Sequence, residues 1–237
     1  MATPTKFLMV SYSGSVGKTV AALHLLYPRV PGAKFIALET INQSASDLGL
    51  AEVEKMQGKK VRELLEHLVL EDAAIVDVGA SNIEQFFAEM TRFHGATDEF
   101  DLVVVPVCPD DKSWQEGLKT VESLLQIGVE ADRIRILPNK IKEDPREEIP
   151  QVFEYAKKKK IPMNPDAFIF ESEVYGYLAH HKMSFRDLIG DNRDYRAEAK
   201  AATDPAERSK LARLHSWTSQ AKPVQANLDV AFDALVG

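Results

Sequence analysis

One stretch of the sequence has residue types and a spacing that suit phosphate binding. A short apolar segment, Phe7–Val10, leads into a loop of small residues. Glycines and small side chains let successive backbone N–H groups turn inward toward an anion, and a helix starting at the loop adds its dipole. The stretch therefore predicts a nucleotide phosphate site formed by Gly14, Ser15, Val16, Gly17, Lys18, Thr19 and Val20.

Two side chains of this loop and one distant acid could supply the remaining chemistry. Lys18 is placed to reach the β- and γ-phosphates, and the Thr19 hydroxyl to coordinate Mg²⁺. A second apolar run, Ala73–Val78, contains Asp77 near its end, where P-loop proteins place the carboxylate that holds the metal's water shell. We expect Thr19 and Asp77 at the metal, with Lys18 and Asp77 as catalytic candidates.

The loop departs from the strict phosphate-binding pattern at one position. The pattern G-x-x-x-x-G-K-[ST] requires glycine where Tyr12 stands. A plain strand–helix turn therefore remains an alternative, although strand, small-residue loop, Gly-Lys-Thr and helix follow in the required order.

A candidate base-recognition residue follows the late apolar run Ile134–Leu137. Asn139 could hydrogen-bond a purine edge, and the alternative is a turn-forming Asn after proline. A guanine site of the Asn-Lys-x-Asp type needs Asp where Lys142 stands. ATP or ADP is therefore favoured over a guanine nucleotide.

Nearly continuous apolar runs alternate with helical patterns through most of the chain. Runs of this kind are typical of parallel strands that are buried on both faces. We predict an α/β fold with a doubly wound, mainly parallel sheet flanked by helices. The expected strands are 7–10, 35–38, 73–78, 102–107, 134–137 and 168–170, and the expected helices are 18–27, 61–70, 83–93, 114–127 and one ending in Lys157–Lys160.

The pattern changes after residue 190, which predicts a nucleotide-binding domain over 1–190 and a helical extension over 191–237. Residues 221–236 have the pattern of a short amphipathic helix, and we expect Trp217 to anchor the extension on the core. Basic and acidic residues of the extension nearly cancel, so DNA contact by the extension alone should be weak. The basic ones are Arg193, Arg196, Lys200, Arg208, Lys210 and Arg213.

Bulk composition narrows the class of protein. The chain has 237 residues, 45% hydrophobic and 27% charged, with a formal net charge of −7. The lone Cys108 permits no intrachain disulfide and is expected to pack at a strand end, which suits a reducing compartment. No apolar run approaches the ~20 residues of a membrane helix. We expect a cytoplasmic protein without a transmembrane segment.

These elements, in this order, resemble the ParA/MinD family of P-loop ATPases, over roughly residues 5 to 190. Within that family the chain is most similar to the plasmid-stability and conjugation proteins typified by StbB. Residues 13–19 match its deviant Lys-Gly-Gly-x-Gly-Lys-Thr motif in part, and Asn139 matches its base-contacting position. The resemblance implies a P-loop NTPase fold that binds ATP or ADP with Mg²⁺, a nucleotide-dependent homodimer and a plasmid-encoded protein partner.

Three departures from the family motif bear on catalysis. The family lysine that reaches across the dimer falls on Ser13, and the second glycine falls on Ser15. Glu39 can stand in for the first acid of the family's Asp-x-Asp stretch, but Ile41 replaces the second, which orients the attacking water. An isoleucine cannot accept a proton, so we expect slow or absent hydrolysis.

Three functions are compatible with these residues. The favoured one is a ParA-like ATP-binding switch in plasmid partition, plasmid stability or conjugative DNA transfer. A metabolic enzyme of the same fold, such as a dethiobiotin-synthetase-like ligase or a small-molecule kinase, is the second. The third is a degenerate P-loop scaffold that binds partners without nucleotide. The histidine pair at positions 180 and 181 is expected on a helix surface rather than in a site.

Overall fold

A parallel β-sheet forms the centre of the molecule. The computed structural model describes residues 5–38, 54–56, 60–190 and 193–237, and within them seven strands lie in the order β3-β2-β4-β1-β5-β6-β7. All neighbouring strands are parallel. The strands are β1 Lys6–Met9, β2 Lys34–Leu38, β3 Glu54–Met56, β4 Ala74–Val78, β5 Leu102–Val107, β6 Ile134–Ile141 and β7 Ile169–Phe170.

Burial on both faces explains why the strands are apolar throughout. Along β1 and the residue that follows it, Phe7 and Met9 belong to one hydrophobic cluster, whereas Leu8 and Val10 belong to the cluster on the opposite face. Side chains alternate across a strand, so a strand covered on both sides needs apolar residues at every position. The predicted doubly wound α/β sheet is confirmed.

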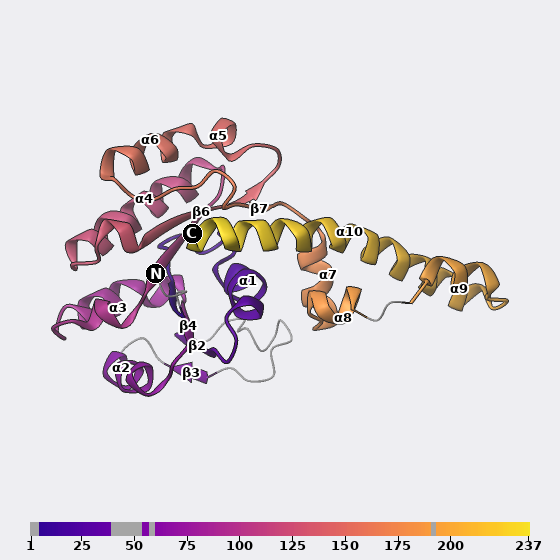
Figure 1. Ribbon diagram of the computed structural model, residues 1–237, viewed down its shortest axis with the longest axis horizontal. Coiled ribbons are helices and arrows are strands. Elements are labelled where there is room, and N and C mark those ends of the chain that lie inside the picture. Colours follow the sequence, from indigo (N-terminus) through magenta and orange to yellow (C-terminus); the bar gives the residue numbers. More distant parts are fainter. Residues whose placement is uncertain (1–4, 39–53, 57–59, 191–192) are drawn as a thin grey trace.

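Helices cover the two faces of the sheet (Figure 1). The first face carries the helix that follows the glycine loop, together with the C-terminal helices; these are α1 Lys18–Ala21, η1 Ala22–Leu26, η2 Tyr27–Arg29, α7 Val174–His181, α8 Phe185–Ile189 and α10 Pro205–Val236. The second face carries α2 Val61–Leu70, α3 Ile83–Met90, α4 Asp111–Gln126 and α6 Pro150–Lys159. Short elements complete the connections: η4 Ala80–Asn82, η5 Ala96–Glu99, η6 Ala131–Arg133, α5 Pro145–Glu148 and α9 Tyr195–Ala201.

The structure corrects several expected elements. The strand β3 was not expected, because its residues Glu-Lys-Met do not form an apolar run. The helix expected over 18–27 is α-helical only to Ala21 and continues as the π-helical η1. The helix expected to end in the lysine run is α6, and Lys160 terminates it in the left-handed conformation at φ 58°.

The C-terminal helix is twice as long as expected. The helix expected over 221–236 is the second half of the 32-residue α10, which passes through Pro223 without ending. Its buried face carries Ala221, Val224 and Leu228, which pack in the same core cluster as β1. Trp217 stacks on Tyr177 of α7 with ring centroids 4.4 Å apart, so it anchors the helix on the core, as expected.

Polar contacts fasten the second half of α10 to the sheet. The Asn227 amide donates to the Phe168 carbonyl at 3.0 Å and accepts from the Phe170 N–H at 3.1 Å. This side chain takes the place of a neighbouring strand along the edge of the sheet, where backbone groups would otherwise lack partners. Arg135 Nε donates to the carbonyl of Leu235 at 2.8 Å, near the C-terminal end of the helix dipole.

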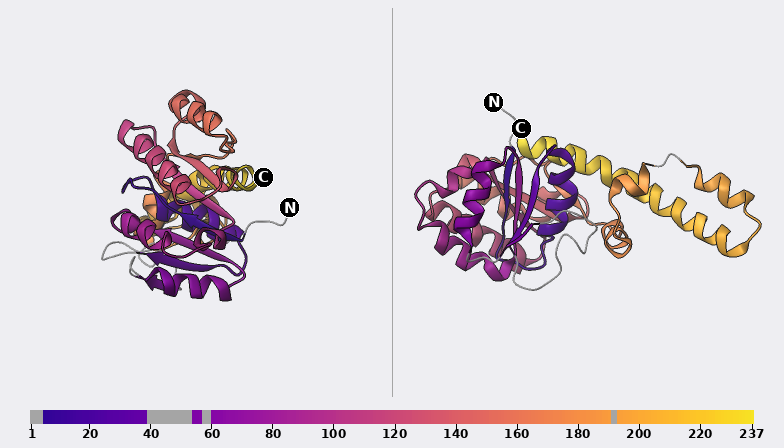
Figure 2. Two further views of the ribbon diagram at one scale, coloured as in Figure 1. Left: turned by 90° about the vertical axis from the view of Figure 1, so that its left-hand side faces the viewer. Right: turned by 90° about the horizontal axis from the view of Figure 1, so that it is seen from below.

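The first half of α10 pairs with α9 in a helical arm that projects from the body (Figures 1 and 2). We call residues 193–214 the arm. A small cluster of Tyr195, Ala199 and Leu211 holds its two helices together. Two of its acids, Asp194 and Asp204, cap the N-termini of α9 and α10.

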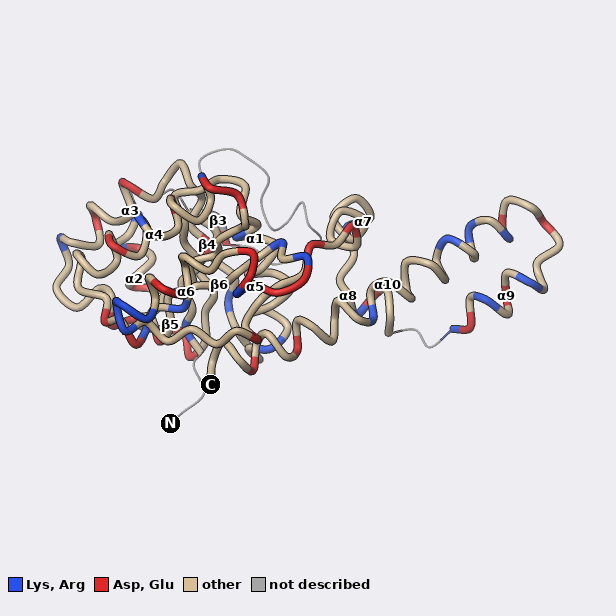
Figure 3. Tube along the Cα trace, turned by 90° about the horizontal axis from the view of Figure 1, so that it is seen from above, with Lys and Arg blue, Asp and Glu red and all other residues tan. Residues whose placement is uncertain are grey.

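Positive charge is concentrated along the middle of α10. From Arg208 to Leu228 the sequence contains Lys and Arg but no Asp or Glu (Figure 3). The expected cancellation of charge therefore holds for the composition of the extension but not along this length of helix. Among the described residues, no helix combines the length and the apolar character needed to cross a membrane.

Candidate functional site

The glycine loop lies where the winding of the sheet reverses direction. The chain leaves β1 toward β2 on one side of the sheet, whereas it leaves the neighbouring β5 toward β6 on the other side. Ligands of open α/β sheets bind in the crevice that such a reversal leaves at the carboxyl ends of the strands. The structure brings the loop, the end of β4 and the ends of β5 and β6 to this crevice.

The tip of the loop is open to solvent, while its flanks are held by the body. Gly14 and Ser15 are exposed, whereas Ser13 and Val16 are buried. The Tyr12 N–H donates to Thr120 Oγ1 of α4 at 3.0 Å, which fixes the entry to the loop. An open tip between two fixed flanks leaves backbone groups available to a phosphate.

Gly17 is required for two independent reasons. Its φ of 75° lies in the left-handed region that favours glycine. A Cβ at this position would also lie 2.6 Å from Asn139 Nδ2, which is too close for any side chain. The glycine therefore sets the turn into α1 and allows β6 to approach the loop.

The Lys18 ammonium lies beneath the loop. Lys18 is only 6% exposed, and its Nζ donates to the carbonyls of Ser13 at 2.6 Å and Ser11 at 3.2 Å. These bonds hold a positive charge against the inner side of the loop. This is the position from which a lysine can meet phosphate oxygens.

Thr19 and Asp77 meet at the base of the loop. Thr19 Oγ1 donates to Asp77 Oδ2 at 2.6 Å, although 58 residues separate them. Burial raises the pKa of the Asp77 carboxyl from 3.8 to about 6, while the Thr19 hydrogen bond and the charge of Lys18 act in the opposite direction. The predicted metal pair is therefore assembled in space.

One oxygen of Asp77 has no partner. Asp77 Oδ1 is buried and makes no hydrogen bond in the described structure. Leaving a buried carboxylate oxygen unsatisfied is costly, so such an atom points to a missing ligand. Hard cations such as Mg²⁺ prefer carboxylate and hydroxyl oxygens, and these residues fit that ion. No group of three or more His, Cys, Asp or Glu in the described residues forms a protein-only metal cluster.

Asn139 braces the glycine loop. Its Nδ2 donates to the Val16 carbonyl at 2.7 Å and its Oδ1 accepts from the Lys140 N–H at 2.8 Å. Lys140, with φ 57°, turns back and donates from Nζ to the Ser15 carbonyl at 2.9 Å. Contact of Asn139 with a purine stays a prediction, and the amide would have to share or exchange these partners.

The end of β5 adds Ser113, which sequence reasoning missed, and places Cys108 against the glycine loop. The Ser113 hydroxyl accepts from the Cys108 N–H at 2.7 Å, and Cys108 Sγ lies 3.9 Å from the Val16 carbonyl. Burial raises the pKa of the Cys108 thiol, so it stays protonated and packs, as expected for a strand end. The position of the Val-rich strand at the reversal of the sheet is the signal that could have identified Ser113.

The other residues singled out in the sequence lie at the following positions. Val20 is half-buried in the first turn of α1. Glu39 and Ile41 lie outside the described residues. His180 and His181 are exposed at the end of α7, as expected for a helix surface.

Among known proteins, the chain is similar to solved structures but not to any protein-family model or curated sequence. No protein-family model matches the chain, and no curated protein sequence matches it. A ParA family ATPase from Chlorobium tepidum superposes with a TM-score of 0.54 at 14% identity, covering 92% of this chain and 98% of that one.

Two nucleotide-bound structures are similar to the same degree. A putative plasmid partition protein from Borrelia burgdorferi bound to AMPPNP gives a TM-score of 0.52 at 12% identity, covering 90% of this chain and 98% of that one. The septum site-determining protein MinD complexed with Mg-ADP from Pyrococcus horikoshii gives a TM-score of 0.52 at 14% identity, covering 95% of this chain and 93% of that one. The chain therefore has the fold of the ParA/MinD-type P-loop ATPases.

Proposed function

We propose that this protein is a nucleotide-binding switch that takes ATP or ADP with Mg²⁺ at the loop formed by residues 14–20. The observation that carries the proposal is the convergence of Lys18, Thr19 and Asp77 at the reversal of the sheet, with one buried oxygen of Asp77 left without a partner. The structural neighbours bound to AMPPNP and Mg-ADP support the same ligand class.

Each residue has a distinct task in binding. The loop N–H groups would bind the phosphate oxygens, and the Lys18 ammonium would neutralise their charge. Thr19 Oγ1 and Asp77 would hold Mg²⁺ directly or through its water shell, which satisfies Asp77 Oδ1. The bound cation would neutralise phosphate charge, and Asn139 would contact the base.

We further propose that hydrolysis is slow or absent. Ser13 occupies the position of the family lysine, and its carbonyl is engaged by the protein's own Lys18. Ile41 occupies the position of the acid that orients water. Positioning and charge neutralisation provide most of the rate enhancement in phosphoryl transfer, so losing both groups should leave binding with little turnover.

A role in partition of plasmids, in their stability or in conjugative transfer of the StbB kind is the most specific form of the proposal. The neighbours include a putative plasmid partition protein and a ParA family ATPase. The state read by a plasmid-encoded partner would be a nucleotide-dependent homodimer in the cytoplasm.

DNA contact, if it contributes, would use the arm. Arg208, Lys210 and Arg213 lie on α10, and none of them makes an ion pair with a described residue. Clustered cations without internal acids suit phosphate backbones. Replacing the three by Ala should weaken duplex binding and flatten its salt dependence, as measured by fluorescence anisotropy.

Isothermal titration calorimetry with ATP and Mg²⁺ tests the proposal. Wild type should bind, Lys18→Ala should lose at least tenfold in affinity, and Lys34→Ala should bind like wild type. Lys34 is a matched control because it is exposed at the opposite end of the sheet's strands, at the start of β2. Thermal melts of all three proteins verify folding. Equal heats from wild type and Lys18→Ala would contradict the proposal.

The same measurements separate the alternatives. A metabolic kinase or ligase would release ADP only when its small-molecule substrate is added. A degenerate scaffold would give no nucleotide heat while still binding its partner. Absence of turnover together with binding that depends on Lys18 supports the switch.

A further inference from the structure

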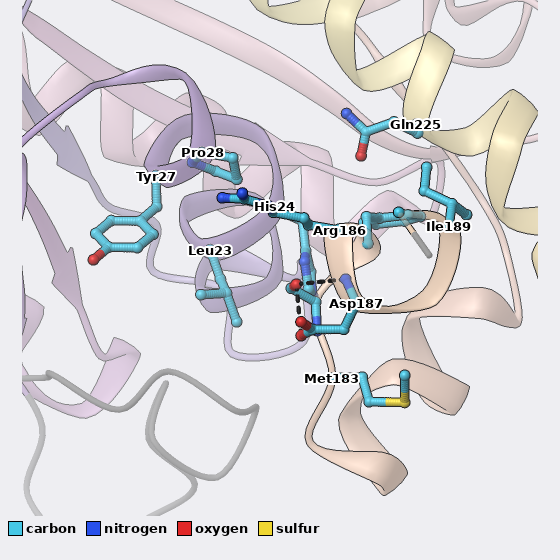
Figure 4. A pocket seen from close by; sticks show the side chains of 12 residues that line it. Leu23, His24, Tyr27, Pro28, Met183, Arg186, Asp187, Ile189 and Gln225 are labelled. Atoms are coloured by element: carbon cyan, nitrogen blue, oxygen red, sulfur yellow. Dashed lines mark hydrogen bonds between the residues drawn. The ribbon is translucent and has the colours of Figure 1, made fainter. Parts of the chain in front are cut away.

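A cavity of about 570 Å³ lies on the first face of the sheet, away from the phosphate site. Figure 4 shows it between residues of η1 and η2, the segment around α8, and Gln225 of α10. Its volume falls in the range of small-molecule pockets, which hold mostly apolar ligands and orient them through a few polar groups.

The lining is mostly apolar, and it includes one buried polar side chain whose ring makes no hydrogen bond to the described residues. Leu23, Met183, Phe185 and Ile189 contribute apolar surface. His24 lines the same space and is only 4% exposed. Neither of its ring nitrogens makes a hydrogen bond within the part of the chain that the structure describes, and its backbone carbonyl accepts from Arg29 Nη1 at 2.9 Å.

The surroundings hold the His24 ring in place and keep it neutral. Phe185 meets the ring edge-on with centroids 5.4 Å apart, and Tyr175 lies at 5.8 Å. Burial, followed by the charge of Arg29, lowers the pKa of His24 to about 4. A neutral imidazole has one donor and one acceptor, and here both lack protein partners.

The start of α8, which lines the cavity beside His24, is held by side-chain hydrogen bonds. Ser184 and Asp187 form a capping box at the start of α8: Asp187 Oδ2 accepts from the Ser184 N–H at 2.8 Å and from its hydroxyl at 2.7 Å. The box restricts the entry of the chain into α8 and so supports a preformed cavity.

We propose that this cavity binds a small, uncharged, largely apolar molecule that carries one hydroxyl or N–H group, which hydrogen-bonds the His24 ring. Apolar residues provide most of the lining, and the carboxylate of Asp187 is already engaged by Ser184, so an uncharged and largely apolar ligand matches the cavity best. The imidazole of His24 lines the cavity, so a hydroxyl or N–H group of a bound ligand can pair with it.

The cavity is joined to the phosphate site through the backbone. The N–H of Ala22, at the start of η1, donates to the carbonyls of Lys18 and Thr19. The π-helical turn of η1 is a type of irregularity that often marks functional positions. Occupancy of the cavity should therefore change nucleotide affinity, a consequence that rests on the proposed nucleotide site.

Fluorescence titration with 2-naphthol and with naphthalene tests the cavity. The two probes share a ring system, and only 2-naphthol can hydrogen-bond His24. Wild type should bind 2-naphthol about tenfold more tightly, the contribution of one buried hydrogen bond. His24→Phe keeps an aromatic ring without nitrogens, so it should bind both probes with equal affinity.

Two further variants make the result specific. Ile189→Trp should fill the cavity and abolish binding of both probes, whereas His180→Phe, which changes an exposed histidine on α7, should bind like wild type. A preference for 2-naphthol that is unchanged in His24→Phe, binding that is unchanged in Ile189→Trp, or no binding to wild type would each overturn the proposal.

The link to the phosphate site has its own readout. Saturating 2-naphthol should change the ATP dissociation constant about fivefold or more, and ATP should change 2-naphthol affinity by the same factor. An unchanged ATP constant would overturn the coupling but not the cavity. If the wild-type protein binds 2-naphthol but does not bind ATP, the proposed nucleotide function is wrong, whereas the proposed ligand site stands.

Discussion

At the scale of single residues, positions in the loop differ sharply in what they tolerate. Gly17 has a left-handed backbone and a neighbouring amide within 2.6 Å of where a Cβ would lie, whereas nothing lies within 4 Å of the corresponding point at Gly14. The two glycines of one motif therefore carry different physical constraints. This contrast supplies a matched pair of variants.

We expect Gly17→Ala to destabilise the protein by about 1–3 kcal/mol, because it combines a strained φ with a clash against Asn139. It should also lower ATP affinity at least tenfold by displacing the loop. Gly14→Ala should leave stability within about 0.5 kcal/mol of wild type. Denaturant unfolding and calorimetry measure both effects, and similar behaviour of the two variants would refute the assignment.

Asp77 gives a prediction about pH. Its pKa is raised by burial from 3.8 to about 6, so the protonated form is favoured in the folded state. The resulting stability is present below pH 4 and is lost as pH rises through about 6, up to an order of 3 kcal/mol. Asp77→Asn lacks this titration.

The difference in unfolding free energy between Asp77→Asn and wild type should therefore increase in favour of the variant from pH 4 to pH 7, measured without Mg²⁺ or nucleotide. Mg²⁺ with ATP should then stabilise wild type more than the variant, because the cation compensates the buried carboxylate. A difference that stays constant over this pH range would contradict the raised pKa.

At the scale of elements, α10 has two halves with different support. Its second half packs in the main core through residues such as Val224 and Leu228, whereas the first half is held mainly by the small cluster around Leu211. Pro223 lies near the junction, where its ring removes one backbone hydrogen bond. Local opening of the arm should therefore cost less free energy than unfolding of the body.

Leu211→Ala should release the arm without unfolding the body. Truncating a buried Leu costs about 2–5 kcal/mol, which is large because the apolar cluster that pairs α9 with α10 is small. Hydrogen exchange of residues 195–214 should accelerate at least tenfold while exchange in β1 and β4 stays unchanged. Lys210→Ala, one residue away and exposed, is the control; loss of protection throughout the sheet would show that the arm and body unfold together.

At the scale of the whole molecule, the open phosphate loop predicts nucleotide-dependent association. Gly14 and Ser15 are exposed at the crevice, so a nucleotide bound there would keep one side open that a second copy could cover. With ATP and Mg²⁺ we expect a mass about twice the 26.4 kDa of the monomer, and a monomer with ADP or without nucleotide.

Light scattering coupled to size exclusion measures this mass directly, and Lys18→Ala should remain monomeric throughout. A mass of one chain in all three nucleotide states, with ATP binding shown by calorimetry, would restrict the switch to changes within a monomer.

The fold was largely predictable because its signals are local. Apolar runs such as Leu102–Val107 correspond to strands, since burial on both faces leaves a mark in contiguous residues. The strand β3 left no such mark, and the continuous α10 was hidden by Pro223 and by a charged, alanine-rich first half. The candidate phosphate-binding residues could be proposed from the sequence because their spacing along the chain is itself the chemical requirement.

The sequence alone determined the class of fold and the glycine loop with its adjacent Lys18 and Thr19, because each of these features depends on residues that are close together in the chain. Only the tertiary structure decided that Thr19 donates a hydrogen bond directly to Asp77, that Asn139 braces the loop, and that His24 lines a cavity beside α8. Thr19 and Asp77 are 58 positions apart in the chain, and Asn139 and Val16 are 123 positions apart. The cavity that His24 lines is formed by residues from separate helices. Their existence depends on which strands and helices become neighbours, and local patterns along the chain carry no record of that order.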